Sequence, residues 1–435
     1  MFNMEYLKME EYPYHFGMKT RIYPSSQQKA IIHYNSECNR FMYNKFVALN
    51  QEYYYWKKAL DTIPEDLQDE SNIEHLAKLK ELSKSVKKIK DKYHIFRAKK
   101  ISKMKGWYDY TNGGYTYKSY QLAWKNYRNG LQNVPTFHKK ATNPYEDKYR
   151  TYRNPRKLTI FIDKTHVKIP KLGTIRCNEI RKLLQKKTDW APGTMTVYKD
   201  ATNKYWLSLQ LGSETPFVEE KSKTKQEIGM DLNVENFGML SNGEIVKNPH
   251  FFTSQQKRLA RLQLILARKY QQAKKQKRNL RHASNYQKMR LKVAKLSRKV
   301  YNRREVFLQE LSTDLVEKYD VIALEELRSS NMLKNHHIAK AIQDVGWRKF
   351  ITMVQYKCDL YNKQLITVNP KMTTQTCSAC GYRLQKENKE GVNERLTLKD
   401  RKWECPNCHI KHIRDVNAAK NILQKGLKTL VAERV

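Results

Sequence analysis

Two Cys-x-x-Cys pairs constrain the fold of this chain more than any other feature of its sequence. They are Cys377 with Cys380 and Cys405 with Cys408, and 24 residues separate them. Two such turns can present four thiolates to one tetrahedral Zn²⁺, which folds a segment too small to have a hydrophobic core of its own. The gap slightly exceeds the usual spacing, and the polar insert at residues 383–401 accounts for the excess. The pattern therefore predicts one structural zinc ribbon.

Two other interpretations of these cysteines explain less of the pattern. A single Cys-x-x-Cys can be a redox pair, and Cys405-Pro-Asn-Cys408-His409 matches the attachment pattern of c-type haem. Either interpretation leaves the other pair without a role. Haem attachment also requires export, and residues 1–11 lack the apolar region of a signal peptide. The odd total of seven cysteines argues against a disulfide framework, and His409 and His412 are at most spare ligands.

The charge balance indicates a polyanionic partner. The 435 residues include 84 Lys and Arg against 43 Asp and Glu, a formal charge of +41, and nucleic acid is the default partner of such a chain. Hydrophobic residues make up 40%, which excludes wholesale disorder, and the length suggests on the order of two to four domains. No stretch approaches the ~18 uninterrupted apolar residues of a membrane span, so we expect neither a membrane partner nor secretion.

Hydrophobic periodicity first predicts a helical region and then a β-rich one. The helical region has a strand at residues 18–24, a helix capped by Ser25 or Ser26, a charged helical segment at residues 78–105, a turn at Asn112-Gly113-Gly114 and a short helix at residues 122–131. From residue 135 to residue 211 the period is two, as in a small barrel, with strands at residues 158–162, 166–169, 174–177, 194–198 and 205–211. A polar linker is expected at residues 213–226.

A third pattern begins at Ile228 and mixes strands with helices. One strand leads into residues 237–240, and Ser241-Asn242-Gly243 is a hairpin turn into residues 244–246. The other predicted elements are helices at residues 253–280, 284–318, 344–362 and 416–430, and strands at residues 321–324 and 365–368.

Three carboxylates stand out by their context. Asp231 lies inside an apolar strand, Glu325 ends another, and Asp415 immediately precedes a helix. Taken singly, each has an ordinary structural explanation, since an Asp before a helix is usually an N-cap. Taken in order, they can meet at one edge of a mixed sheet, where three anions could ionise together only beside divalent cations. Oxygen ligands suit Mg²⁺ or Mn²⁺, and two such ions roughly 4 Å apart could clamp the attacking water and the leaving oxygen of a phosphodiester.

At these residues the chain resembles the TnpB family, the transposon-encoded RNA-guided nucleases related to compact type V CRISPR effectors. The resemblance covers most of the chain, and both cysteine pairs resemble the zinc ribbon of the family's nuclease domain. Three segments resemble the family's RuvC motifs, namely Ile228-Gly-Met-Asp231-Leu232, Ala323-Leu-Glu325-Glu-Leu327 and Arg414-Asp415-Val-Asn417-Ala-Ala-Lys-Asn421. The N-terminal matches are Lys19-Thr-Arg21-Ile-Tyr23-Pro24, Arg40-Phe-Met-Tyr43-Asn44, Gln121-Leu-Ala-Trp124 and Pro135-Thr-Phe137.

The resemblance implies an α/β multidomain protein with a RuvC, RNase H-like nuclease domain. Its catalytic Mg²⁺ ligands would be Asp231, Glu325 and Asp415, and the family's pattern favours Glu325 over the adjacent Glu326. Asn233 and Glu326 depart from frequent family residues without touching this triad. The implied domains are a wedge β-barrel at residues 1–24 and 135–215, a helical recognition lobe at residues 25–134, the nuclease domain at residues 216–375 and 410–435, and the zinc ribbon, a target nucleic-acid-binding insert, at residues 376–409.

The resemblance also implies an activity and its partners. The expected function is that of an RNA-guided DNA endonuclease that uses two Mg²⁺, for which Mn²⁺ can substitute, and one structural Zn²⁺. Its partners would be a guide RNA from the transposon end and double-stranded target DNA beside a short flanking motif, with one chain per guide RNA. Such a protein would act at the nucleoid in a prokaryotic cytoplasm. Arg414, adjacent to Asp415, is hypothesised to stabilise the pentacovalent phosphate.

Three other functions compete with this one. A compact CRISPR effector would use the same chemistry, and sequence separates the two weakly. A cleavage-dead relative that binds DNA as a repressor is disfavoured because such proteins lose triad carboxylates. A plain zinc-ribbon nucleic-acid binder leaves Asp231 and Glu325 unexplained.

A long basic stretch suggests where nucleic acid binds. Eighteen Lys or Arg and no acidic residue occupy the 48 positions from Lys257 to Arg304. With no opposite charge to pair at helical spacing, we favour contacts to phosphates over a merely solvated face. The candidates are Lys257, Arg258, Arg261, Arg268, Lys269, Lys274, Lys275, Arg278, Arg298, Arg303 and Arg304.

Overall fold

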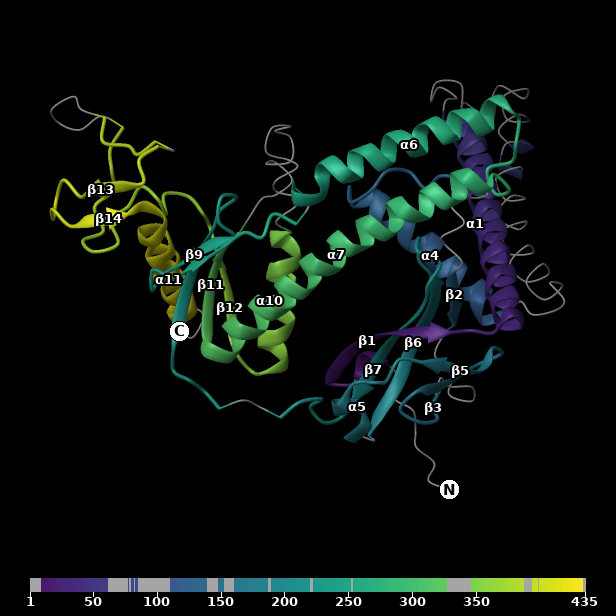
Figure 1. The fold of residues 1–435 in the computed structure, drawn as a ribbon, viewed down its shortest axis with the longest axis horizontal. Coiled ribbons are helices and arrows are strands. Elements are labelled where there is room, and N and C mark those ends of the chain that lie inside the picture. Colours follow the sequence, from purple (N-terminus) through teal and green to yellow (C-terminus); the bar gives the residue numbers. More distant parts are fainter. Residues whose placement is uncertain are drawn as a thin grey trace. The chain divides into compact units, whose positions relative to one another are not determined.

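The chain forms two compact units, Met1–Phe217 with Ala273–Gln287 and Val218–Gln272 with Lys288–Val435 (Figure 1). The boundary at Phe217 lies in the polar segment where the sequence suggests a linker. Residues 273–287 belong to the first unit, although in the sequence they lie between two helical stretches of the second. The computed structural model describes residues 9–61, 110–138, 148–151, 160–186, 189–219, 222–251, 253–326, 346–386, 393–397 and 399–432, with isolated positions between 77 and 84.

The first unit contains a seven-stranded antiparallel sheet in the order β2-β6-β7-β1-β5-β4-β3. Inward-facing Phe16, Met18 and Ile22 alternate with exposed Lys19 and Tyr23 along β1, which is the pattern of a strand buried on one face. The strands are β1 (Tyr14–Tyr23), β2 (Lys148–Thr151), β3 (Ile160–Phe161), β4 (His166–Ile169), β5 (Gly173–Cys177), β6 (Trp190–Lys199) and β7 (Tyr205–Ser213). Each of the five strands predicted between residues 135 and 211 is present where the structure describes it, whereas β2 was not predicted.

Two long helices accompany this sheet, and the first begins as the sequence predicted. Ser25 caps α1 (Ser26–Asp61): the Gln28 N–H donates to Ser25 Oγ, and the Ser25 N–H donates to Gln28 Oε1, at 3.2 and 2.9 Å. Two short helices, η1 (Met9–Glu11) and α5 (Lys182–Lys186), complete the unit. Nearly all of the predicted charged segment at residues 78–105 lies outside the described residues.

The turn predicted at Asn112-Gly113-Gly114 is wrong, because these residues lie inside α4 (Tyr110–Arg128). Glycine disfavours a helix interior by only about 1 kcal/mol, and burial of an aromatic face can outweigh that cost. Tyr120, 3% exposed, packs against Tyr43 and Phe46 of α1 with ring centroids 5.8 and 5.5 Å apart. Tertiary packing therefore decides the conformation here.

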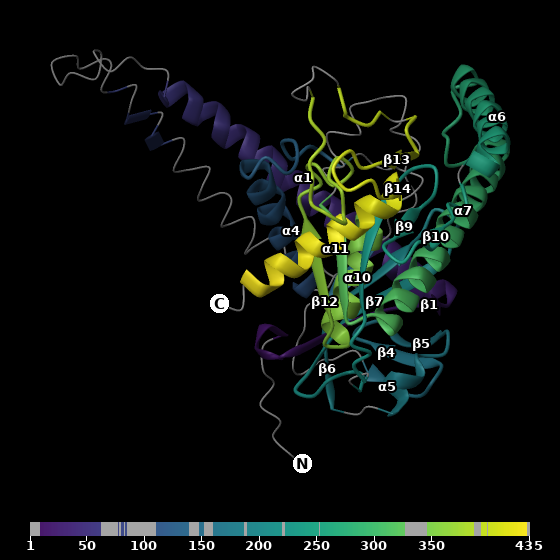
Figure 2. The same ribbon diagram turned by 90° about the vertical axis from the view of Figure 1, so that its left-hand side faces the viewer.

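The second unit has three layers built around a five-stranded mixed sheet (Figures 1 and 2). Its order is β10-β9-β8-β11-β12, with antiparallel pairing from β10 to β8 and parallel pairing from β8 to β12. The turn before β10 is a hairpin, as predicted, with Gly243 at a φ of 94°. The strands are β8 (Glu227–Leu232), β9 (Gly238–Leu240), β10 (Ile245–Val246), β11 (Val321–Glu325) and β12 (Gln364–Val368).

Helices cover both faces of this sheet. On one face, Ile228, Met230 and Leu324 share a hydrophobic core with residues of two of the helices, α7 and α10. On the other face, Ala323 and Val368 pack against Ile422. The helical elements are η4 (Thr253–Gln255), α6 (Gln256–Lys275), α7 (Ser284–Lys318), α10 (Trp347–Leu360) and α11 (Arg414–Ala432). None of the helices in the described part of the chain combines the length and apolar character of a membrane span.

Two glycines let α11 approach the sheet more closely than any other residue would allow. A Cβ on Gly229 of β8 would overlap the carbonyl oxygen of Ala419, and a Cβ on Gly426 would come within 2.9 Å of the Ala323 Cβ. The helix backbone therefore rests directly on β8 and β11. This contact fixes the position of the N-terminal turn of α11 relative to the ends of both strands.

We predict that Gly229→Ala destabilises the second unit by about 1–3 kcal/mol, because the added methyl meets helix backbone rather than a side chain that could move. Thermal unfolding should show a fall of several degrees in Tm. The matched control is Gly17→Ala in β1, where no atom lies within 4 Å of the new Cβ. Equal melting temperatures for the two variants would contradict the close packing of α11.

Candidate active site and metal centre

Alternation along two parallel strands places two carboxylates on the face that α11 covers. In β8, Asp231 follows Gly229 on that face, and in β11, Glu325 follows Ala323. Asp415 lies in the first turn of α11, which begins at Arg414, so the alternative explanation of Asp415 as an N-cap does not apply. The three carboxylates are 7%, 8% and 7% exposed, respectively. The structure thus brings together acids that are far apart in sequence.

The electrostatics of this cluster are those of anions held in a poorly solvated space. Burial, followed by the charges of Glu325 and Asp415, raises the pKa of Asp231 well above its ordinary value, and only Arg414 opposes this. Burial also raises the pKa of Glu325, against a hydrogen bond from Thr373 and the charge of Lys425. Clustered carboxylate oxygens are a donor set that fits hard divalent cations, which would relieve the repulsion.

Three contacts at the cluster were not predicted from the sequence. The Thr373 hydroxyl donates to Glu325 Oε1 at 2.8 Å. Arg401 donates to Asp415 Oδ2 at 3.4 Å and forms an ion pair with Glu235. Thr373 and Arg401 lie in polar segments beside the cysteine pairs, where no periodicity distinguishes them from solvated residues. Only their position in the folded chain reveals them.

Arg414, the residue hypothesised to assist the reaction, also contacts the cluster. Its Nε donates to Asp415 Oδ1 at 3.1 Å, and its Nη1 donates to the Thr397 carbonyl oxygen at 3.1 Å. Its side chain is 11% exposed, whereas that of Arg401 is 51% exposed. The guanidinium groups of both arginines therefore lie against the same carboxylate.

Without divalent cations, the buried acids should make stability fall as the pH rises. An acid whose pKa is raised by folding binds its proton more tightly in the folded chain. Its stabilising contribution is complete below the ordinary pKa of 3.8 for Asp231 and is lost as the pH rises through the raised value. We predict that Asp231→Asn increases the Tm of the Mg²⁺-free protein near pH 7 and flattens its dependence on pH. Melting curves from about pH 4 to pH 8 measure this, and an unchanged slope in the variant would contradict it.

The four paired cysteines also come together, as predicted, in the insert between β12 and α11. Their sulfur atoms all lie within 4.8 Å of one another, and both the Cys377–Cys408 and the Cys380–Cys405 sulfurs are 3.7 Å apart. The Asn407 side chain and the Tyr382 backbone N–H are the main groups that lower the pKa of Cys380 to about 6. Four thiols in one small cluster are a donor set that fits a structural zinc ion.

The described part of the segment around these cysteines has almost no other core. Leu384 and Trp403 are its buried apolar side chains, with Tyr382 and Leu396 partly buried beside them. A two-stranded antiparallel ribbon of β13 (Lys402–Glu404) and β14 (Lys411–Ile413) completes it. A core of this size cannot fold the segment alone, so metal binding is expected to do so.

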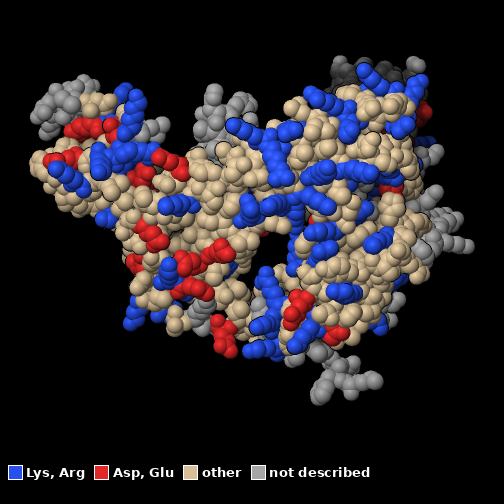
Figure 3. Space-filling view, viewed as in Figure 1, with Lys and Arg blue, Asp and Glu red and all other residues tan. Residues whose placement is uncertain are grey.

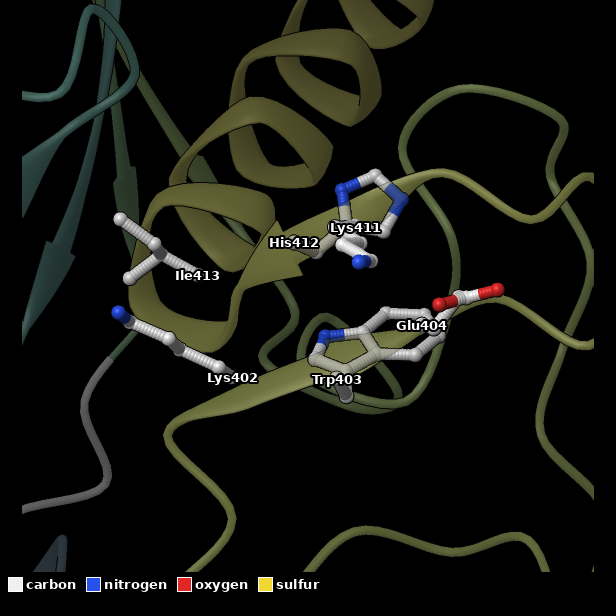
Figure 4. Close-up of a pocket in the computed structure, with 6 residues that line it drawn as sticks. All are labelled: Lys402, Trp403, Glu404, Lys411, His412 and Ile413. Atoms are coloured by element: carbon white, nitrogen blue, oxygen red, sulfur yellow. The ribbon is translucent and has the colours of Figure 1, made fainter.

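A shallow pocket of about 310 Å³ lies on this two-stranded ribbon (Figure 4). Trp403 and His412 face each other from its two strands, with ring centroids 4.9 Å apart. His412 Nε2 is also 3.1 Å from Cys377 Sγ, and burial lowers the pKa of this histidine. His412 is thus held between an aromatic ring and a thiol, and it belongs to the packing of the ribbon. The pocket is lined by Lys402, Trp403, Glu404, Lys411, His412 and Ile413.

We predict about one zinc per chain, as four clustered cysteines require, and its loss in Cys408→Ser. The variant should also expose the residues around β13 and β14 to protease, because the metal replaces a core there. Metal analysis by mass spectrometry and limited proteolysis measure the two effects. Cys38→Ala, which changes a buried cysteine outside the cluster, is the control and should retain its zinc. Retention of zinc by Cys408→Ser would rule out the four-sulfur site.

The predicted nucleic-acid contacts lie on α6, on α7 and on the segment between them, where Lys and Arg side chains gather (Figure 3). Arg298 stacks over the Tyr301 ring at 5.0 Å. Lys269, Arg298 and Arg304 are half-buried, and the other eight candidates are exposed. The apolar side of these helices is buried at Leu259, Leu296 and Val300. The helices thus carry a basic outer face, whose binding role remains a prediction.

Three family models match the chain in sequence order. A "Helix-turn-helix domain" matches residues 14–58, a "Probable transposase" model of the OrfB_IS605 type matches residues 208–336, and a "Cas12f1-like, TNB domain" matches residues 347–422. A "TnpB-like protein" of Acanthamoeba polyphaga mimivirus is 28% identical over 160 residues, 35% of this chain and 28% of its own. The chain belongs to the TnpB family. Its first model covers β1 and the single helix α1 here, rather than two helices joined by a turn.

Two further relatives match longer stretches of the chain. A Streptomyces pristinaespiralis protein is 33% identical over 237 residues, and an Escherichia coli protein is 26% identical over 324 residues. Both are named "Putative RNA-guided DNA endonuclease", the second with the suffix InsQ. The matches cover 54% and 71% of this chain but only 53% and 72% of the relatives. The chain therefore spans about half the length of the first.

Solved structures include a distant match. A Cas12f1–sgRNA–target DNA complex aligns with 94% of this chain and 98% of its own chain, at 13% identity and a TM-score of 0.48.

Proposed function

We propose that this TnpB-family chain is an RNA-guided DNA endonuclease encoded by a transposable element. The observation that carries the proposal is the buried cluster of Asp231, Glu325 and Asp415, in a family whose relatives are named RNA-guided DNA endonucleases. A protein that only binds nucleic acid has no need for three carboxylates buried together in its interior, because their burial costs stability.

In this proposal the second unit contains a RuvC, RNase H-like nuclease domain. Its mixed sheet, with α11 on one face, presents the three acids from two parallel strands and one helix. We assign residues 216–375 and 410–435 to this domain and residues 376–409 to its zinc ribbon. The first unit would supply the wedge β-barrel, from residues 1–24 and 135–215, and the helical recognition lobe, from residues 25–134.

The three carboxylates would hold two Mg²⁺, and Mn²⁺ can substitute. Bound there, the two ions would lower the pKa of an attacking water and neutralise charge on the scissile phosphate. The chain's own residues would orient these ligands and balance their charge. The Thr373 hydroxyl donates a hydrogen bond to one oxygen of Glu325, and Arg414 and Arg401 donate to Asp415. The two guanidinium groups would then lie near the negative charge that develops on the phosphate.

Target choice would rest on base pairing with a guide RNA, while the protein reads only a short flanking motif. The basic face of α6 and α7 supports this division of labour, because Lys and Arg contacts to phosphates bind nucleic acid without reading its sequence. A compact CRISPR effector with the same chemistry is the second candidate, and the "Cas12f1-like, TNB domain" match favours it as an alternative. A cleavage-dead repressor is disfavoured by the intact carboxylate cluster.

The first test is to express the protein with its native flanking sequence and to sequence the RNA that co-purifies. We expect a short RNA ending in variable spacer sequence, and Mg²⁺-dependent cleavage of DNA that matches the spacer. Only random cellular RNA in the preparation would contradict the guided mechanism.

The matched pair for the chemistry is Glu325→Gln and Glu326→Gln. Glu325 is 8% exposed inside the cluster, whereas the adjacent Glu326 is exposed to solvent. The first variant should bind target DNA normally but lose cleavage, and the second should cleave like the wild type. Gel-shift and cleavage assays on the same substrate separate binding from chemistry. Equal loss in both variants would reject the assignment of Glu325.

A further inference from the structure

Four polar side chains on one side of α11 hold the segment that joins β12 to the first zinc knuckle. Asn417, Asn421, Gln424 and Lys425 recur at helical spacing, so they project from the same side of the helix. Their partners are main-chain groups between residues 369 and 378. The segment therefore lies along α11, the helix that also carries Asp415 (Figure 2).

The two asparagines make the most buried of these contacts. Asn421 Nδ2 donates to the carbonyl oxygens of Thr373 and Thr376 at 2.8 and 2.7 Å. Asn417 Nδ2 donates to the Thr376 carbonyl oxygen at 2.7 Å, and its Oδ1 accepts from the Ser378 N–H at 2.8 Å. Asn417 and Asn421 are 2% and 5% exposed. A shift of the segment would leave buried amides unpaired, which is costly, so its path is strongly determined.

The segment connects the two metal-binding groups directly. At one end, Thr376 and Ser378 flank Cys377, a member of the four-sulfur cluster. At the other end, Thr373, 2% exposed, donates from its hydroxyl to Glu325 Oε1. The Pro370 carbonyl oxygen, 3.0 Å away, competes for the same proton, and an ionised carboxylate is the stronger acceptor. Few bonds therefore separate the zinc knuckle from a carboxylate of the catalytic cluster.

We propose that Thr373 is a positioning residue for Glu325, and that Asn417 and Asn421 transmit the state of the zinc ribbon to it. The proposal rests on the function proposed above, since it assumes that the carboxylate cluster binds divalent cations. With zinc bound, Cys377 is fixed, the segment keeps its path along α11, and the Thr373 hydroxyl holds one oxygen of Glu325. The other oxygen is then oriented for a divalent cation. The ribbon thus contributes to the affinity of the nuclease site for its metal.

Thr373→Val and Thr373→Ser form the matched pair that tests the first step. Valine keeps the shape of threonine but loses the hydroxyl, and serine keeps the hydroxyl. Hydrogen-bond partners of metal ligands typically contribute about 10–100-fold in metal affinity. We expect that order of weakening in Mn²⁺ binding for Thr373→Val, measured by titration calorimetry on the full chain, and near wild-type binding for Thr373→Ser. Cleavage by Thr373→Val should need correspondingly more Mg²⁺, with a smaller change in the rate at saturation.

Asn421→Leu tests the second step. It should retain its zinc by mass spectrometry yet bind Mn²⁺ more weakly, in the same direction as Thr373→Val. Gln424→Leu, which removes an exposed contact of the same helix to the Ser378 carbonyl oxygen, is the control and should bind Mn²⁺ normally. Cys408→Ser, which removes zinc by changing a cysteine outside the segment, should weaken Mn²⁺ binding as well.

The outcomes separate this inference from the proposed function. Normal Mn²⁺ binding by Thr373→Val and Asn421→Leu would overturn the coupling and leave the nuclease assignment standing. Equal weakening by the serine and valine variants would show that packing rather than the hydroxyl matters, which also overturns it. If Asp231→Asn binds Mn²⁺ as tightly as the wild type, the carboxylates are not the metal site, and the proposed function fails together with the coupling.

Discussion

The close contact between α11 and the mixed sheet is the constraint on which the site depends. It is possible because Gly229 and Gly426 place no side chain between the helix backbone and the strands. The helix contributes Asp415, whereas the strands contribute Asp231 and Glu325, so the distance between helix and sheet sets the separation of the carboxylates. A larger residue at either glycine would push the third acid away from the other two. The close packing of α11 on the sheet is therefore also required to bring the three carboxylates together.

The carboxylate cluster lowers the stability of the fold that contains it. Burial and mutual repulsion raise the pKa of Asp231, which means that the folded chain resists charging this group. Two arginines and one threonine hydroxyl offset part of that cost through Asp415 and Glu325. In the proposed function, divalent cations would offset the rest, so burial of the acids would favour metal binding. The segment that leads to the four cysteines contacts Glu325 through Thr373 and is held by the amides of Asn417 and Asn421.

Most strands and the four-cysteine cluster could be predicted from the sequence because their patterns are local, whereas the choice of Glu325 over Glu326 came from the resemblance to the family. Alternation from Ile228 to Leu232 already places Asp231 on the face opposite the apolar residues, and two cysteine pairs suffice for a four-sulfur cluster. Non-local contacts could not be predicted. The helix through Gly113 follows from aromatic packing on another helix, and Thr373 and Arg401 acquire partners only when the insert folds back. Arg281, in the segment between α6 and α7, lies 4.0 Å from Glu37 of α1. The sequence of neither segment alone predicts this contact.

The central claim is that Asp231, Glu325 and Asp415 form one divalent-cation site. Anomalous scattering from crystals of the protein grown with Mn²⁺ tests it most directly, because the signal locates the metal without any assumption about activity. The account predicts anomalous peaks in contact with all three carboxylates, and a zinc peak among the four cysteine sulfurs. Manganese bound elsewhere, with the three carboxylates free of metal, would contradict it.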